Sequence, residues 1–397
     1  MPISAAREAV LAAVVQLPSE PIPLGIALDR TLAEPLAAAA DVPPFGNSAM
    51  DGFAVRHDAS SGPLPIVGES RAGRPSPVSV GPGEAIRIST GAPVPAGADA
   101  VARVEDTAES DGRVELTAAV AAGQNVRAAG EDLRAGERVL EAGTRLGAAE
   151  LAVAVGAGAG AVVCARRPRV AILCTGDELR EPGAPLGPGE IHNSNAVMLA
   201  ALARREGAEL VADERVADER DATEAAFAAA LDDADLVIAS GGVSVGPHDH
   251  VKPALTALGV EERFWRVSLQ PGKPTWFGTR GERLVLGLPG NPVSSYVTFL
   301  LFARPALRAL QGASAPLPPR EEAVLTTALP RRGREQVVRV RLATAPGADG
   351  RPHATATPTG PQGSHITRSL LGADGLAFVA IGDGEVAAGE SIPVERI

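Results

Sequence analysis

Between Arg169 and Leu310, short apolar runs alternate with helical patterns, and this alternation constrains the fold more than any other feature of the sequence. The apolar runs are continuous, which is typical of strands buried on both faces of a parallel sheet. Strands that alternate with helices form a doubly wound, three-layer α/β domain. The expected strands are Arg169–Cys174, Glu209–Val216, Asp235–Ser240 and Arg283–Leu288. The expected helices are Asn195–Glu206, Asp221–Asp232 and Pro292–Leu310.

A chain of 397 residues needs more than one hydrophobic core, so several domains are expected. The residue pattern changes along the rest of the chain. Residues 3–40 are Ala-rich and helical in pattern, whereas 43–139 carries short apolar runs between Gly and Pro residues, which predicts a β-rich domain. Leu146–Val163 returns to a helix and a strand, and we expect it to pack against the N-terminal helix. The β-rich domain would then be an insertion. The final segment has short β runs with Gly turns, typical of a small barrel or sandwich.

A multidomain α/β plus β protein is therefore expected, with a helical linking layer and a small C-terminal β-barrel. The expected domains are a linking helical and β domain at 1–42 and 140–168, an inserted β-rich domain at 43–139, the α/β domain at 169–312 and the C-terminal β-barrel domain at 313–397.

Composition and charge exclude several classes of function. The net charge is -11 and no Lys/Arg cluster stands out, so a nucleic-acid binder is not expected. Ile3–Leu17 is interpreted as an amphipathic helix because it lacks the basic leader and apolar core of a signal peptide. The apolar run Leu151–Cys164 is shorter than the roughly 20 residues of a membrane span, so no membrane is expected. Cys164 and Cys174 are the only cysteines, which excludes a disulfide framework and points to the cytosol.

In a doubly wound sheet, ligands bind at the carboxyl ends of the strands, where the strand order switches. The first loop at such a place is Thr175–Glu178, a Gly turn followed by two carboxylates. Carboxylates there can hold a hard cation such as Mg²⁺ together with a substrate's phosphates. The alternative is that Asp177 or Glu178 only caps the following turn.

A second loop, Ser240 to Gly246, follows a buried strand and is rich in Gly and Ser. Successive Gly amides form a nest for phosphate or another oxyanion, and the Ser hydroxyls add donors. The predicted anion-binding residues are Ser240, Gly241, Gly242, Ser244 and Gly246. Asp249 follows and is placed to reach a metal beside that anion.

A third pair of loops adds a cation and a helix start. Lys273 stands between Pro271 and Pro274 on a stiff loop, which suits a point charge for an anion. After the next strand, Asn291 is expected to cap a helix whose first turn holds Pro292.

In the β-rich domain, Asp51, Thr90 and Asp132 each lie next to a Gly turn. Taken alone, such hydroxyls and carboxylates are ordinary turn chemistry. Their order along the chain, together with the loops described above, suggests that they also have a functional role.

Taken together, these segments resemble the molybdopterin molybdenumtransferase family, which comprises the MoeA proteins and the matching domain of gephyrin. The resemblance extends from about residue 5 to 310. The matching segments are Pro43–Ala54, Thr90–Pro95, Gly97–Val101, Gly130–Asp132, Thr175–Leu179, Asn193–Asn195, Ser240–Gly246, Pro271–Pro274 and Gly287–Pro292.

The resemblance implies a homodimeric enzyme that inserts molybdenum from molybdate into adenylyl-molybdopterin and releases AMP with the help of Mg²⁺ (or Zn²⁺). The inserted β-rich domain of one subunit would face the α/β domain of the other. Asp51, Thr90 and Asp132 would reach in from the former, and Lys273 would help to hold molybdate. The residues implied on the α/β side are Glu178 and Asp249 as metal ligands and catalytic groups, with Asp218, Pro289 and Pro292 lining the site.

One departure from the family and two other functions accompany this hypothesis. Many family members carry Lys where this chain has Arg266 and Gln270, so a cation that could contact an oxyanion is lost at Gln270. A second possible function is adenylylation, because the α/β domain also resembles adenylyltransferases of the same pathway, which lack the β-rich insert.

A third possible function is that of a binding or scaffold protein, although the charged pocket residues are retained. A transient complex with the molybdopterin adenylyltransferase is a further expectation.

Overall fold

The computed structural model describes residues 1–242, 250–346 and 351–397. Its α/β domain holds a six-stranded sheet in the order β16-β13-β17-β21-β20-β18. The strands are β13 (Arg169–Thr175), β16 (Glu209–Val216), β17 (Leu236–Ser240), β18 (Glu261–Trp265), β20 (Trp276–Arg280) and β21 (Arg283–Leu288). The four predicted strands are present and parallel to one another.

The sheet is mixed rather than wholly parallel, because β20 runs antiparallel to both β21 and β18. The cause is a tight turn in which Arg280 pairs with Arg283, leaving Gly281 at φ +58° between them. A two-residue connection can only join antiparallel strands, since parallel strands need a longer crossover.

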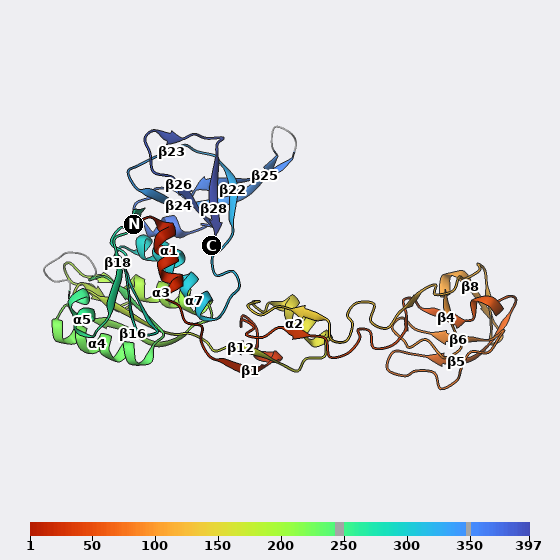
Figure 1. Ribbon diagram of the computed structural model, residues 1–397. Coiled ribbons are helices and arrows are strands. Elements are labelled where there is room, and N and C mark those ends of the chain that lie inside the picture. Colours follow the sequence, from red (N-terminus) through yellow and green to blue (C-terminus); the bar gives the residue numbers. More distant parts are fainter. Residues whose placement is uncertain (243–249, 347–350) are drawn as a thin grey trace.

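Helices cover both faces of this sheet, as the alternation predicted (Figure 1). The helices are α3 (Ser194–Arg205), α4 (Arg220–Asp233), α5 (Val251–Ala257), α6 (Pro292–Thr298) and α7 (Arg304–Leu310), with the π-helical turn η4 (Phe299–Ala303) between the last two. Successive residues of β13 enter different cores: Ile172 packs with the side of α3 and α6, and Leu173 packs with the side of α4 and α5. A strand with alternate side chains in two cores has no solvent-facing side, which explains its continuous apolar run.

The last helix is interrupted by a proline. Pro305 has no N–H, so it cannot bond to the carbonyl of Leu301 four residues earlier. The Arg7 Nε donates to that carbonyl at 3.1 Å. The interruption thereby becomes a docking point for α1 (Ile3–Ala12), the first helix of the chain.

Helix α1 differs from its prediction in length and in packing. It ends at Ala12, and the residues that follow contain short strands rather than more helix. It packs on η4 and α7, and its buried side chains belong to the main core of the α/β domain. The expectation that Leu146–Val163 would pack against it is therefore wrong. The helix and strand expected in that segment are present as α2 (Ala148–Gly156) and β12 (Ala161–Ala165).

A closed five-stranded barrel forms the C-terminal domain, because β24 pairs with β26 as well as with β25. Its strands are β22 (Arg320–Leu325), β24 (Glu335–Pro346), β25 (Pro352–Pro358), β26 (Gly375–Val379) and β28 (Ser391–Arg396). Smaller elements beside it are β19 (Leu269–Gln270), β23 (Leu329–Pro330), β27 (Glu385–Val386) and η5 (Thr367–Leu370). Arg7 also reaches this barrel, with its Nη atoms 2.6 and 2.7 Å from the carboxylate of the buried Glu395.

An arm of paired segments leads away from this body (Figure 1). Its antiparallel pairs are β1 (Ser19–Pro23) with β12, β2 (Leu36–Ala37) with β11 (Arg138–Leu140), and β3 (Asn47–Ser48) with β10 (Val126–Arg127). Helix α2 and η1 (Leu24–Ile26) pack over its base.

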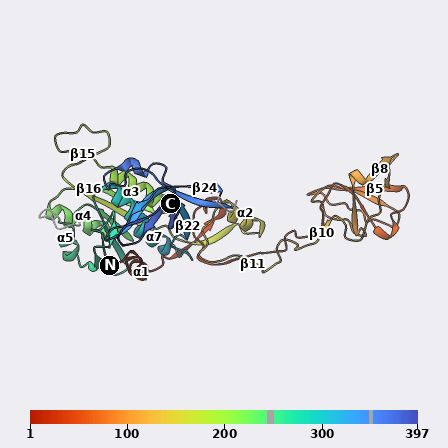
Figure 2. The same cartoon turned by 90° about the horizontal axis from the view of Figure 1, so that it is seen from above.

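The β-rich domain stands at the far end of the arm, apart from the α/β domain in both views (Figures 1 and 2). Its sheet has the order β7-β4-β6-β5-β9-β8. The strands are β4 (Gly52–Val55), β5 (Leu64–Ser70), β6 (Ala85–Ile88), β7 (Ala100–Arg103), β8 (Thr107–Ser110) and β9 (Arg113–Leu116), with the turns η2 (His57–Ala59) and η3 (Val104–Asp106).

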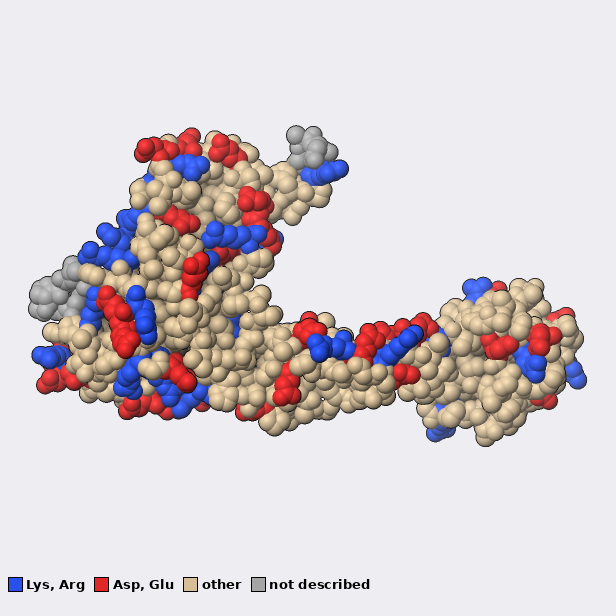
Figure 3. Space-filling model, viewed as in Figure 1, with Lys and Arg blue, Asp and Glu red and all other residues tan. Residues whose placement is uncertain are grey.

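The surface mixes charges of both signs. On the face shown in Figure 3, acidic and basic side chains are interspersed along the arm and on the domains at its two ends. No helix within the described residues is long and apolar enough to cross a membrane.

Candidate active site

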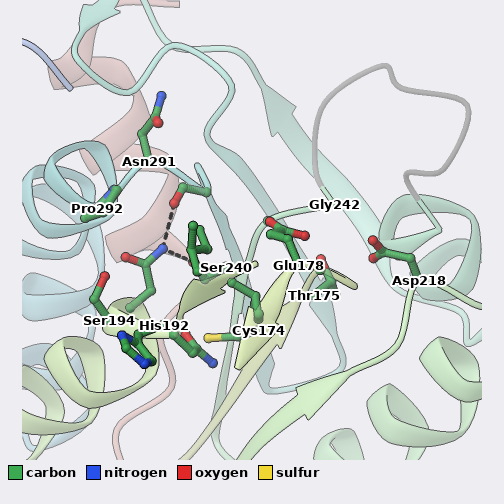
Figure 4. Close-up of a pocket in the computed structure, with 17 residues that line it drawn as sticks. Cys174, Thr175, Glu178, His192, Ser194, Asp218, Ser240, Gly242, Asn291 and Pro292 are labelled. Carbon is green, nitrogen blue, oxygen red and sulfur yellow. Dashed lines mark hydrogen bonds between the residues drawn. The ribbon is translucent and has the colours of Figure 1, made fainter. Parts of the chain in front are cut away.

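A cavity of about 490 Å³ opens at the carboxyl ends of β13 and β17 (Figure 4). This is the switch point of the sheet, because the chain leaves β13 through α3 toward β16 and then returns to place β17 on the other side. The small strands β14 (Leu179–Arg180) and β15 (Ile191–His192) border it. The predicted residues Glu178, Asp218, Ser240, Gly241, Gly242 and Pro292 line this one cavity.

Two loops are tied together at the acidic side of the cavity. The backbone N–H of Asp177 donates to the Asp218 carboxylate at 3.2 Å, and the N–H of Asp218 donates to the Asp177 carboxylate at 3.3 Å. The Asp177 carboxylate therefore joins this loop to the loop of Asp218, which differs from the turn cap of the alternative interpretation. Glu178 is exposed on the cavity wall. The carboxylates of Glu178 and Asp218 point toward one another in Figure 4.

Glycine is required where β17 turns into the cavity. Gly241 and Gly242 adopt φ values of +92° and +64°, which L side chains rarely adopt. A Cβ on Gly242 would lie 2.5 Å from Val251 Cγ2, and one on Gly241 would lie 2.7 Å from the Thr175 carbonyl oxygen. The two glycines bring backbone, rather than side chain, to the ligand side of the loop.

The polar floor of the cavity is buried and only partly satisfied. Asn195 Nδ2 donates to Ser240 Oγ at 2.9 Å and to the Gly290 carbonyl at 2.8 Å (Figure 4). The Oδ1 of Asn195 and the Oγ1 of Thr175 are buried, and neither has a hydrogen-bond partner among the described residues. Because a buried polar atom without a partner costs about 1–3 kcal/mol, both atoms call for a ligand in the cavity.

Sequence reasoning did not assign these two residues to the site. Thr175 was part of the acidic loop, and Asn195 part of a matching segment, but neither was given a role. Their positions in the sequence could have indicated a role at the site, because Thr175 ends a buried strand and Asn195 lies in the first turn of α3. That turn is capped by Asn193, whose Oδ1 accepts a hydrogen bond from the Ala196 N–H at 3.1 Å.

Cys174 lines the cavity but is not a nucleophile. Burial raises the pKa of its thiol to about 12, against a smaller opposing effect of the Asn193 side chain. A thiol with that pKa stays protonated at neutral pH. Cys174 is a free and buried cysteine.

Pro289 and Lys273 are not part of the described cavity wall, whereas Asn291 and Pro292 line it. Pro289 is buried, and its carbonyl accepts a hydrogen bond from Ser295 Oγ. Lys273 is exposed on the loop after β19, a strand that pairs with β24 of the barrel. Asn291 does not cap α6 with its side chain, contrary to prediction. Its Nδ2 instead donates to Ser364 Oγ of the C-terminal domain at 3.2 Å, while Pro292 does begin the helix.

The candidates from the inserted domain are remote from the cavity. Asp51 Oδ1 accepts a hydrogen bond from the N–H of Thr90 at 2.7 Å, so these two form a pair. Asp132 lies on the arm, where its N–H donates to the Val42 carbonyl at 2.9 Å. All three side chains are exposed. In one chain the arm holds the β-rich domain away from β13 and β17 (Figures 1 and 2).

Three predicted residues, Ser244, Gly246 and Asp249, lie outside the described residues. Within the described residues, no three His, Cys, Asp or Glu side chains gather as a metal site. The described carboxylates at the cavity, Glu178 and Asp218, offer oxygen ligands of the kind that Mg²⁺ prefers.

Comparison with known proteins covers the whole chain. Residues 1–158 match the MoeA N-terminal region (domain I and II), 171–309 match a probable molybdopterin binding domain, and 322–397 match the MoeA C-terminal region (domain IV). Molybdopterin molybdenumtransferase 2 of Mycobacterium tuberculosis is 39% identical over 392 residues, 94% of each chain. The Haemophilus influenzae molybdopterin molybdenumtransferase is 36% identical over 93% of this chain and 91% of its own. A crystal structure of the molybdopterin biosynthesis MoeA protein from Pyrococcus horikoshii superposes over 100% of both chains, with a TM-score of 0.83 and 27% identity.

Proposed function

Because the chain belongs to the MoeA family of molybdopterin molybdenumtransferases, we propose that its cavity between β13 and β17 holds adenylyl-molybdopterin during molybdenum insertion. Its place in molybdenum cofactor biosynthesis follows from the family. The observation that supports this use of the cavity is the pair of buried atoms without partners, Thr175 Oγ1 and Asn195 Oδ1, at the switch point of the sheet. A hydroxyl and an amide carbonyl together offer a donor and an acceptor to a polar ligand.

The phosphate groups of such a substrate would bind to backbone amides. Gly241 and Gly242 expose the backbone after β17, and the amino end of α3 also faces the cavity through Ser194. Amides at a Gly turn and at a helix start both favour a bound anion. These groups offset the negative net charge of the chain locally.

Glu178 and Asp218, with Asp249 from outside the described residues, are proposed to hold Mg²⁺. Carboxylate oxygens suit Mg²⁺ better than Zn²⁺, which takes His and Cys ligands more often. When bound, the cation would neutralise charge on the pyrophosphate link whose cleavage releases AMP. The protein's own contribution is the loop geometry. The hydrogen bonds between Asp177 and Asp218 hold the loop of Asp218 against the loop that carries Glu178.

The substrate molybdate is proposed to meet Lys273. This side chain is exposed on the stiff loop between β19 and β20, next to the junction with the barrel. The neighbouring Gln270 supplies no positive charge, so Lys273 is the cation that this loop offers to an oxyanion.

We propose a homodimer because the candidate residues of one chain lie far apart. Asp51, Thr90 and Asp132 match the family's motifs, yet the arm carries the first two far from the cavity of the same chain (Figure 1). A second subunit would bring its β-rich domain to the cavity. We further propose a cytosolic location and a transient complex with the molybdopterin adenylyltransferase that supplies the substrate.

The direct test is a turnover assay with adenylyl-molybdopterin, molybdate and Mg²⁺ that follows AMP release. The wild type should release AMP only when molybdate is present. Glu178→Gln and Asp51→Asn should each slow release by about a hundredfold, the size of one lost electrostatic contact to a transition state. Glu282→Gln, at the exposed β20–β21 turn, is the control and should keep full activity.

Two outcomes would contradict the proposal. If the protein consumed ATP and adenylylated the pterin, it would perform the preceding step instead. If it bound the pterin tightly without releasing AMP, it would be a carrier or scaffold. Full activity of Glu178→Gln would remove the proposed role of the cavity wall.

A further inference from the structure

A second cavity, separate from the candidate active site, contains a buried arginine without adequate partners. Arg304 begins α7 and is only 3% exposed, yet in the part of the chain that the structure describes its Nε and Nη2 atoms have no hydrogen-bond partner. Its Nη1 reaches only the Arg396 carbonyl, at a long 3.4 Å. Burial lowers the pKa of Arg304 to about 10, so the guanidinium still carries its charge at neutral pH. An unpaired buried charge is costly, which makes this arginine the feature to explain.

The cavity around it has a volume of about 360 Å³ and is strongly basic. Five arginines line it: Arg145, Arg205, Arg304, Arg308 and Arg396. We call it the arginine cavity. Among the described residues, it shares no lining residue with the cavity between β13 and β17. Arg205 ends α3, and the candidate active site lies at the beginning of α3, so the two cavities are at opposite ends of one helix.

The carboxylate side chains of Glu206 and Glu395 lie near enough to raise the pKa of Arg304, but among the described residues neither forms an ion pair with it. Glu206 is the one carboxylate side chain in the described cavity wall, and Arg308 Nε holds it at 2.8 Å with Arg145 Nη1 at 3.6 Å. Arg396 pairs with Glu321 on the barrel at 3.1 Å. Among the described residues, neither Arg205 nor Arg304 forms an ion pair with a carboxylate side chain.

The position of Arg304 follows from the same interruption that docks α1. The π-helical turn η4 ends at Ala303, directly before Arg304, and Pro305 follows it. Such turns often occur at functional sites. Here the turn sets the guanidinium into the space between three parts of the chain, since the arm supplies Arg145, the α/β domain Arg308, and the barrel Arg396.

We propose that the arginine cavity binds a small tetrahedral dianion, of which inorganic phosphate is the simplest. The planar guanidinium suits a tetrahedral oxyanion because two parallel N–H groups can each reach one oxygen. Within the described ranges, Arg304 has two nitrogens without a hydrogen-bond partner, and Arg205 lines the cavity without an ion pair. Sulfate and molybdate share this chemistry and differ in size. The anion would join the arm, the α/β domain and the barrel at their common junction.

The test measures anion binding by calorimetry and thermal unfolding of the full chain, with chloride at matched ionic strength as the reference. Phosphate should raise the unfolding temperature in a saturable way, because a ligand that binds only the folded state stabilises it. Arg304→Met should lower the affinity by about tenfold or more, the loss of one charge-assisted hydrogen bond. Arg113→Gln removes one positive charge in the remote β-rich domain and should leave the affinity unchanged.

The same variant gives a second readout that does not depend on binding. Without phosphate, Arg304→Met should be at least as stable as the wild type, because it removes a desolvated charge and keeps an apolar stem. Parallel titrations with sulfate and molybdate identify which tetrahedral anion fits best. The proposal is overturned if wild type shows no saturable binding of any of the three, or if Arg304→Met retains the full effect. A merely structural role for Arg304 predicts that Arg304→Met unfolds more readily even without phosphate, which also counts against it.

Discussion

The α/β domain and the β-rich domain solve the problem of burial in different ways. The main core of the α/β domain also takes in side chains from α1 and from the barrel, such as Ile3, Val337 and Phe378. The β-rich domain has its own small cores around Phe53 and Ile88, and the described residues of both cores lie between 53 and 126. The α/β domain, α1 and the barrel therefore form one packed body, which we call the packed body. The β-rich domain is positioned only by its arm.

The two parts of the proposed site, the cavity between β13 and β17 and the residues of the β-rich domain, are therefore held in place differently. The cavity between β13 and β17 is fixed by strand ends, positive-φ glycines and hydrogen bonds inside the packed body. Asp51 and Thr90 are fixed relative to each other, but their position relative to a cavity depends on a long arm. We therefore expect substitutions in the packed body to affect stability and activity, and those at Asp51 to affect activity alone.

The largest expected effect on stability concerns the ion pair that joins the first helix to the last strand. Glu395→Gln leaves the buried Arg7 without its charged partner, and breaking such a pair costs about 3–5 kcal/mol. Hydrogen exchange followed by mass spectrometry should show faster exchange in the α/β domain and barrel and unchanged exchange in strands β4–β7. Equal acceleration in the β-rich domain would mean that the two bodies unfold together.

A smaller effect is expected at a pair of positive-φ glycines, one in each body. Gly242→Ala meets both an unfavourable φ and a contact of 2.5 Å with Val251, and should cost about 2–4 kcal/mol. Gly91→Ala has a φ of +77° but nothing within 4 Å of its Cβ, so only the backbone strain of about 1 kcal/mol remains. Denaturant unfolding of each variant provides the comparison. Similar losses for the two would show that the turn after β17 can relax.

The smallest effect concerns acid sensitivity. Burial opposes the charge on Asp235, but hydrogen bonds from Arg166 and the Arg169 N–H, with the charge of Arg283, lower its pKa below the ordinary value. A carboxyl whose pKa is lower in the folded state adds stability above its unfolded pKa of about 4, and this is lost as the pH falls further. Asp235→Asn should therefore flatten the decline of unfolding free energy below that pH.

Asp58 in the β-rich domain is the matched control for this prediction. A hydrogen bond from Arg56 lowers its pKa as well, but the pair is exposed to solvent. Exposed ion pairs contribute little to stability, so Asp58→Asn should leave the acid profile unchanged. An equal response of both variants would show that pairing matters more than burial here.

Sequence patterns predicted the parts of the fold where one structural demand dominates. The parallel strands were identified because burial on both faces demands continuous apolar residues. The Ala-rich stretch after Ala12 was misassigned to helix, since Pro18, Pro21, Pro23 and Pro35 interrupt it and outweigh the Ala content. The β18–β20 hairpin was missed because its strands are short and carry charged residues among the aromatic ones.

The candidate site was predictable in its loops but not in its unsatisfied atoms. Gly241, Gly242 and Glu178 could be proposed because Gly turns and carboxylates at strand ends are visible in the sequence. The unpartnered oxygens of Thr175 and Asn195 depend on how three elements pack around them, and no local pattern records that.

The central claim is that one active site is built from two chains. A chain with Asp51→Asn and a chain with Glu178→Gln should each be about a hundredfold slower alone. Co-refolding or co-expressing them should restore AMP release. With random pairing, half of the dimers contain one intact site out of two, so activity should return to about a quarter of the wild-type value. If the mixture stays as inactive as its parts, each site lies within one chain and the account is wrong.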